Sequence, residues 1–165
     1  MMRVAVLGAG SWGTTLANLL ARKGEEVRIW AYESEVVDAI NSRHENPLYL
    51  PDCTLAPRLT AAADARDVVR GASVILSAAP SHAVRAVLGR VAGCVEAGTL
   101  VVSATKGLEV DTLASMSTVI AEVLPDTQVA VLSGPSFAQE VFRGQPTAVV
   151  AAAAQPETAL AAQQL

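Results

Sequence analysis

One segment near the start of the chain constrains its fold more than any other. Residues Gly8-Ala9-Gly10-Ser11-Trp12-Gly13 match the pattern G-x-G-x-x-G. An apolar run precedes this segment, an amphipathic helical pattern that closes at Arg22-Lys23-Gly24 follows it, and a second strand is predicted over 27–31. The pattern therefore lies at the strand-to-helix junction of a β-α-β unit, where it typically holds the pyrophosphate of a dinucleotide.

Each glycine of this motif has a predicted task. Gly8 makes the tight turn out of the strand, Gly10 lets the backbone approach a pyrophosphate, and Gly13 lets the helix lie close to the sheet. The free N–H groups around Ser11 and Trp12 should face the phosphates. The alternative interpretation is a glycine-rich turn that holds no ligand.

Composition narrows the class of protein. The 165 residues are 52% hydrophobic and carry a net charge of −4, which suits one domain and argues against a nucleic-acid partner. Cys53 and Cys94 are isolated, so we expect reduced thiols, no metal site and a cytoplasmic location. No apolar run approaches the ~18 residues of a membrane span, so we expect no membrane insertion. We also expect no signal peptide, because a strand pattern begins at residue 3.

Strand and helix patterns alternate along the chain. Short apolar runs typical of buried strands lie at 3–7, 27–31, 73–78, 99–103, 128–133 and 147–153. Because these runs are apolar throughout and helical patterns separate most of them, we predict an α/β fold with a doubly wound, mostly parallel sheet of the Rossmann type. The proline-containing residues 44–60 are predicted to form a long excursion over the surface.

Helix starts are predicted at polar residues that can cap a first turn: Ser34, Ser81, Asp111, and Ser136 paired with Gln139. A last helical pattern begins at Gln155 and is still running at Leu165. We therefore expect the chain to be a fragment of a two-domain protein.

Two later strand ends carry candidate ligand-binding residues. Lys106 follows the strand at 99–103, and Gly134 and Ser136 follow the strand at 128–133. Because parallel sheets bind ligands at their carboxyl edge, these positions suit a small phosphorylated ligand. The alternative interpretation makes Lys106 a solvated surface residue and Ser136 only a helix cap.

The choice of cofactor depends on the end of the second strand. Glu33 lies 20 residues after Gly13, where an acidic residue binds ribose hydroxyls and favours NAD. Tyr32 precedes it, and Glu33 is equally compatible with a solvated helix start, so NAD and NADP both stay open. His82 could transfer protons but is more typical of a surface histidine at a helix start, and His44 is a weaker candidate.

Four segments in order, Gly8–Thr14, 46–51, 104–109 and 133–138, resemble bacterial NAD(P)-dependent glycerol-3-phosphate dehydrogenases at their N-terminal domain. The resemblance covers essentially the whole chain and implies interconversion of glycerol 3-phosphate and dihydroxyacetone phosphate, which supplies phospholipid synthesis. It implies contacts with the cofactor at the following residues: Ser11, Trp12, Tyr32, Tyr49, Lys106 and Ala138. It also implies that Lys106, Gly134 and Ser136 hold the substrate.

The family has a second, helical domain that supplies the proton-accepting lysine, and nothing in this chain matches it. We therefore expect residues 1–165 to be the dinucleotide-binding domain, without a catalytic residue of its own, of a protein that is dimeric at full length. Two other interpretations stay open. One is a related 6-phosphogluconate-type or ketopantoate-type dehydrogenase, and the other is a non-catalytic NAD(H)-sensing domain.

Overall fold

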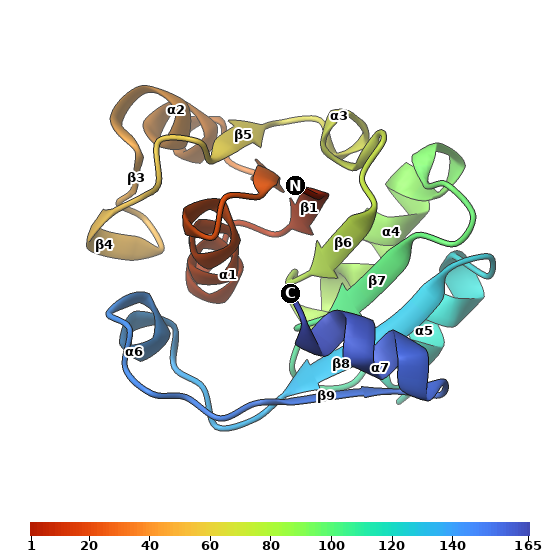
Figure 1. The fold of residues 1–165 in the computed structure, drawn as a ribbon. Coiled ribbons are helices and arrows are strands. Elements are labelled where there is room, and N and C mark those ends of the chain that lie inside the picture. Colours follow the sequence, from red (N-terminus) through yellow and green to blue (C-terminus); the bar gives the residue numbers. More distant parts are fainter.

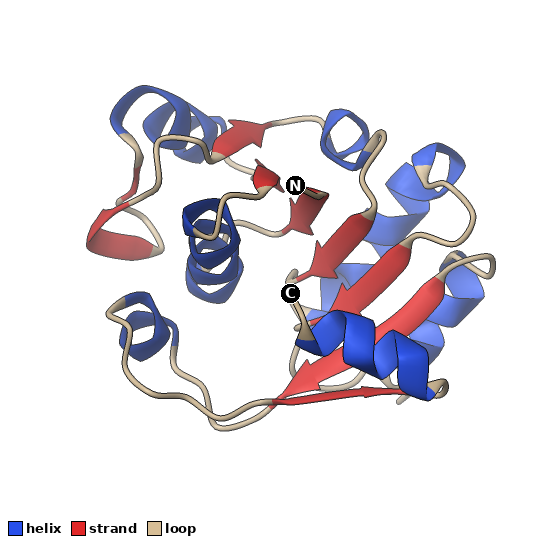
Figure 2. Ribbon diagram, viewed as in Figure 1, coloured by secondary structure: helices blue, strands red, loops and turns tan.

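The computed structural model describes residues 1–165 and is built around one seven-stranded sheet (Figures 1 and 2). Its strands are β1 (Arg3–Leu7), β2 (Glu26–Trp30), β5 (Thr60–Ala62), β6 (Val74–Ser77), β7 (Leu100–Ser103), β8 (Gln128–Ser133) and β9 (Val150–Ala153). The order is β5-β2-β1-β6-β7-β8-β9, and every neighbouring pair is parallel except β8 and β9. The predicted doubly wound, mostly parallel sheet is confirmed.

Helices cover both faces of this sheet. They are α1 (Ser11–Arg22), α2 (Ser34–Arg43), α3 (Ala65–Val69), α4 (Val84–Val91), α5 (Met116–Val123), α6 (Ala138–Phe142) and α7 (Pro156–Gln163). Val4 and Val6 of β1 pack in one core with α1, α2 and α7, whereas Ala5 and Leu7 pack in a second core with α3, α4 and α5. Figure 1 shows α1 and α7 on the near side of the sheet and α4 and α5 behind it. Two covered faces explain why the central strands β1, β6 and β7 are apolar at every position except Arg3, Ser77 and Ser103 at their ends.

The excursion predicted at 44–60 has more structure than its prolines suggest. A small antiparallel pair, β3 (Glu45–Asn46) and β4 (Leu50–Thr54), forms there, and β5 then joins the edge of the main sheet beside β2. Neither β5 nor α3 has a sequence signal strong enough to be predicted, because each is short and polar in part.

The predicted helix caps are wrong at four positions: Ser34, Ser81, Asp111 and Ser136. Ser34 is already helical and Glu33 occupies the N-cap, while Ser81 opens a 3-10 turn ahead of α4. The start of α5 is instead capped by Ser115, whose hydroxyl accepts a hydrogen bond from the Thr118 N–H. Capping depends on the backbone angles of the preceding loop, which residue type alone does not determine.

The order of strands fixes where a ligand can bind. The chain leaves β1 toward β2 on one side, and it later returns to β6 on the other side of β1. The carboxyl ends of β1 and β6 therefore mark the point where the strand order reverses, which is where open α/β sheets hold ligands.

Candidate functional site

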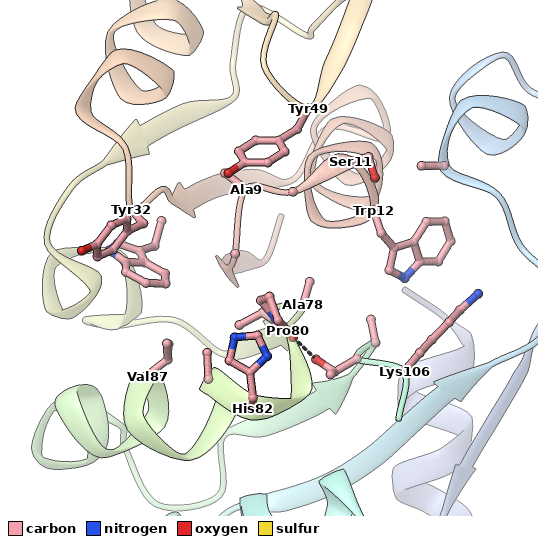
Figure 3. A pocket seen from close by; sticks show the side chains of 18 of the residues that line it. Ala9, Ser11, Trp12, Tyr32, Tyr49, Ala78, Pro80, His82, Val87 and Lys106 are labelled. Carbon is pink, nitrogen blue, oxygen red and sulfur yellow. Dashed lines mark hydrogen bonds between the residues drawn. The ribbon is translucent and has the colours of Figure 1, made fainter. Parts of the chain in front are cut away.

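A cavity of about 770 Å³ opens at this reversal point and extends along the carboxyl edge of the sheet (Figure 3). A volume of this size suits a cofactor. Most predicted site residues line it: Gly8, Gly10, Ser11, Trp12, Tyr32, Glu33, Tyr49, Lys106, Ser136 and Ala138. Gly13 and Gly134 are not among the lining residues.

The glycine loop is shaped by close backbone contacts. A methyl group on Gly8 would lie 2.8 Å from the backbone carbon of Ala78, and Gly8 has a φ of +118°. A methyl group on Gly13 would lie 1.9 Å from the Gly8 carbonyl oxygen, so α1 packs directly against the turn. Gly10, in contrast, has open space where a side chain would stand. The loop thus leaves room beside the first N–H groups of α1, which have no partner within the helix.

Asn46 anchors the β3–β4 pair to the glycine loop. Its buried amide donates to the Ala9 carbonyl oxygen and to Thr14 Oγ1, each at 2.8 Å, and its Oδ1 accepts the Tyr49 N–H at 3.3 Å. Sequence analysis missed this residue, because an asparagine before a proline is typical of any turn. The excursion is therefore part of the cavity wall.

Tyr32, Glu33 and Tyr49 line the cavity just beyond the end of β2. The Tyr49 hydroxyl donates to Glu33 Oε1 at 2.6 Å, and this hydrogen bond raises the pKa of Tyr49 above its ordinary value. Tyr32 stands beside them and is 78% exposed. In Figure 3, Tyr32 and Lys106 lie at opposite sides of the cavity.

Lys106 provides positive charge at the other end. Its Nζ donates to the Ser136 carbonyl oxygen at 3.3 Å and forms no ion pair, so its charge is available to an anion. Ser136 is buried, and its hydroxyl donates weakly to the Gly134 carbonyl oxygen at 3.4 Å. Gly134 has a φ of +153°, and a methyl group there would lie 2.8 Å from the Ala148 carbonyl oxygen.

An ion pair holds the segment that follows Lys106. Arg85 on α4 donates two hydrogen bonds to the Glu109 carboxylate, at 2.7 and 2.9 Å, and a third to Glu122 on α5. The guanidinium lowers the pKa of Glu109 to about 2. Thr105 fixes the other side of Lys106, because its hydroxyl donates to the Ala79 carbonyl oxygen at 2.8 Å.

The two histidines and two cysteines considered from the sequence do not form a common site. His82 lines the cavity, whereas His44 lies outside it, at the left-handed end of α2. Cys53 and Cys94 are free thiols, and no group of His, Cys, Asp or Glu side chains is arranged to hold a metal ion. None of the helices combines the length and the apolarity that crossing a membrane requires.

Sequence analysis also missed three residues of the cavity wall, the apolar Trp30 and Val87 and the cationic Arg90. The helical spacing of Val87 indicated only a core face, and Arg90 had no signal at all. Trp30 donates its indole N–H to the Ala63 carbonyl oxygen, so its ring has a fixed position.

Known proteins similar in sequence to this chain include glycerol-3-phosphate dehydrogenases. A family model described as the N-terminus of NAD-dependent glycerol-3-phosphate dehydrogenase matches residues 3–159. The glycerol-3-phosphate dehydrogenase (NAD(P)+) of Geobacter sulfurreducens is 47% identical over 99% of this chain, and that of Anaeromyxobacter dehalogenans is 50% identical over 92%. The chain spans about half the length of these curated relatives, 50% and 47% respectively.

Solved structures similar to this chain include further glycerol-3-phosphate dehydrogenases. The crystal structure of a glycerol-3-phosphate dehydrogenase from Coxiella burnetii superposes with a TM-score of 0.92 at 38% identity, over 99% of this chain and 50% of that one. The Saccharomyces cerevisiae enzyme gives a TM-score of 0.85 at 31% identity, over 94% of this chain and 48% of that one. A GDP-mannose dehydrogenase of 17% identity and TM-score 0.80 shares the fold alone.

Proposed function

Because the chain belongs to the family of NAD-dependent glycerol-3-phosphate dehydrogenase N-termini, we propose that it is the dinucleotide-binding part of such an enzyme. The enzyme would interconvert sn-glycerol 3-phosphate and dihydroxyacetone phosphate with NAD or NADP. The observation that carries the proposal is the single cavity that joins the glycine loop to Lys106 and Ser136.

The residues at the glycine loop fit a dinucleotide. Gly10 leaves open space beside the N-terminus of α1, where a pyrophosphate is favoured by free N–H groups and by the helix dipole. Trp30 and Val87 offer an apolar surface for a base. Ser11, Trp12, Tyr49 and Ala138 line the same cavity and are the further cofactor contacts that we propose.

The residues at the opposite end fit a phosphorylated three-carbon substrate. Lys106 offers an unpaired positive charge, and the left-handed backbone at Gly134 places Ser136 beside it. We assign Lys106 to substrate and cofactor, and Gly134 and Ser136 to substrate.

The chemistry divides between the cofactor and the chain. A bound nicotinamide supplies the hydride acceptor or donor. Lys106 neutralises the substrate phosphate or the oxygen that becomes negative during the reaction. We assign no proton acceptor to this chain, and we propose that it lies in the part of the enzyme that the relatives have in addition.

The test is oxidation of glycerol 3-phosphate by the full-length product, followed through the absorbance of the reduced nicotinamide. Lys106→Ala should lower kcat/KM by about 100-fold or more, as loss of a charge-stabilising group does. His82→Ala removes another side chain from the same cavity and should lower it far less. Equal, small losses in both variants would contradict the role of Lys106, and an enzyme without glycerol-3-phosphate activity would contradict the function.

The proposal includes three properties of the whole protein. We infer a cytoplasmic location, a homodimer at full length, and a role in supplying glycerol 3-phosphate for phospholipid synthesis. Sedimentation of the full-length product tests the dimer, and cell fractionation tests the location.

A further inference from the structure

The relatives use NAD or NADP, as their names print, and the wall at the end of β2 is the part of this cavity where the two cofactors differ. NADP carries a phosphate on the adenosine ribose where NAD carries a hydroxyl, and that ribose lies beside the residues after the second strand of a Rossmann fold. In this chain those residues are Tyr32 and Glu33. Neither side chain is cationic, so nothing at the end of β2 would neutralise a phosphate.

Glu33 is held in place instead of being free to turn away. Tyr49 donates to one carboxylate oxygen at 2.6 Å, which leaves the second oxygen able to accept a hydrogen bond from a ribose hydroxyl. Tyr49 itself is fixed through Asn46, which accepts the Tyr49 N–H and donates to the Ala9 carbonyl oxygen in the glycine loop. The carboxylate thus has a defined position relative to the loop that would bind the pyrophosphate.

Positive charge is scarce at this side of the cavity. Lys106 lies at the far side from Tyr32 (Figure 3), and the other cationic lining residue is Arg90, an exposed side chain on α4 that forms no ion pair. Arg90 is therefore the one group that could favour NADP, while Glu33 is the group that directly follows β2.

We propose that Glu33, positioned by Tyr49, makes this chain select NAD(H) over NADP(H). The carboxylate accepts a hydrogen bond from a ribose hydroxyl of NAD(H), and it repels the additional phosphate of NADP(H) by like charge. Tyr49 acts as a positioning residue, since its hydroxyl holds the carboxylate. The inference rests on the proposed dinucleotide site.

Calorimetric titration of the chain with NADH and NADPH in parallel tests the selection. NADH should bind at least about tenfold more tightly, a difference of ~1.4 kcal/mol. Glu33→Gln should reduce the ratio of the two affinities by about tenfold, mainly by strengthening NADPH binding, whereas Glu33→Asp keeps the charge and should retain the preference. Tyr49→Phe should reduce the ratio of NADH to NADPH affinity by less than Glu33→Gln does.

Glu35→Gln is the matched control, because Glu35 is an acidic residue of the same first turn of α2 that does not line the cavity. It should leave the ratio nearly unchanged, and an equal effect at Glu35 and Glu33 would overturn the assignment to Glu33. Tighter NADPH binding that disappears in Arg90→Ala would also overturn the proposal and assign the ribose phosphate to Arg90. In that case glycerol-3-phosphate activity would still support the proposed function, whereas no saturable binding of either nucleotide would overturn the selection and the cofactor site together.

Discussion

Two glycines of the loop after β1 differ in what a methyl group would meet. At Gly13 it would lie 1.9 Å from the Gly8 carbonyl oxygen, which is backbone and has no free direction in which to move. We expect Gly13→Ala to destabilise the fold by about 1–3 kcal/mol or more, as overpacking does. Gly10→Ala meets nothing within 4 Å and should leave the melting temperature nearly unchanged while weakening dinucleotide binding. Thermal unfolding and NADH titration of both variants check this, and equal melting temperatures for the two variants would contradict it.

Asn46 links two segments through buried hydrogen bonds. Removing its side chain leaves the Ala9 carbonyl oxygen and the Thr14 hydroxyl without this donor, so Asn46→Ala should cost about 1–3 kcal/mol of unfolding free energy. Asn41 is a suitable comparison, because it also forms two hydrogen bonds to backbone, with Ala61, but it is exposed. Urea unfolding should show the smaller loss for Asn41→Ala, and the reverse order would disprove the anchoring role.

At the scale of elements, Arg85 joins α4 to the segment after β7 and to α5. The pKa of Glu109 is lowered from 4.5 to about 2 by the hydrogen bonds from Arg85, so its carboxylate stabilises the fold at every pH above 4.5. As the pH falls from 4.5 toward 2, the unfolded chain takes up the proton first, and this stabilisation is lost. Wild type should therefore exceed Glu109→Gln in melting temperature by a constant amount above pH 4.5, and the difference should shrink below it.

The comparison with Glu109→Gln is needed because Asp64 behaves similarly. Its pKa is also lowered to about 2, by hydrogen bonds with Arg66, so acid destabilises wild type through both groups. Asp64→Asn keeps Glu109, so adding Glu109→Gln to it should lower its melting temperature by an amount that shrinks below pH 4.5, as in wild type. A difference between wild type and Glu109→Gln that does not change with pH would show that the ion pair does not titrate as described.

The elements also show what could be predicted from the sequence. The apolar runs of β1, β6, β7 and β8 predicted a mostly parallel sheet, and burial on both faces explains the pattern in β1, β6 and β7. The glycine pattern, the strand ends and the family resemblance together indicated ten of the 23 residues that line the cavity. Asn46, Arg90 and the β5 edge could not be predicted, since their roles come from contacts between segments far apart in the sequence.

At the scale of the whole molecule, the cavity is where both layers of the fold meet. Its lining comes from the loop before α1, which packs in one core, and from α4, which packs in the other. A ligand that fills it contacts segments that are brought together only in the folded chain, so it should bind the native state and not the unfolded one.

Saturation with cofactor should therefore raise the melting temperature of the entire chain. At a concentration 100 times the Kd, binding adds about 2.7 kcal/mol, which corresponds to a rise of roughly 5–10 °C for a protein of this size. The rise should grow with the logarithm of the NADH concentration, and Gly10→Ala should reduce it because a methyl group occupies the space left for the pyrophosphate. Calorimetric scans in a dilution series check both points. If the rise is the same in Gly10→Ala as in wild type, NADH is bound elsewhere than at the glycine loop, because only a ligand at that loop meets the added methyl group.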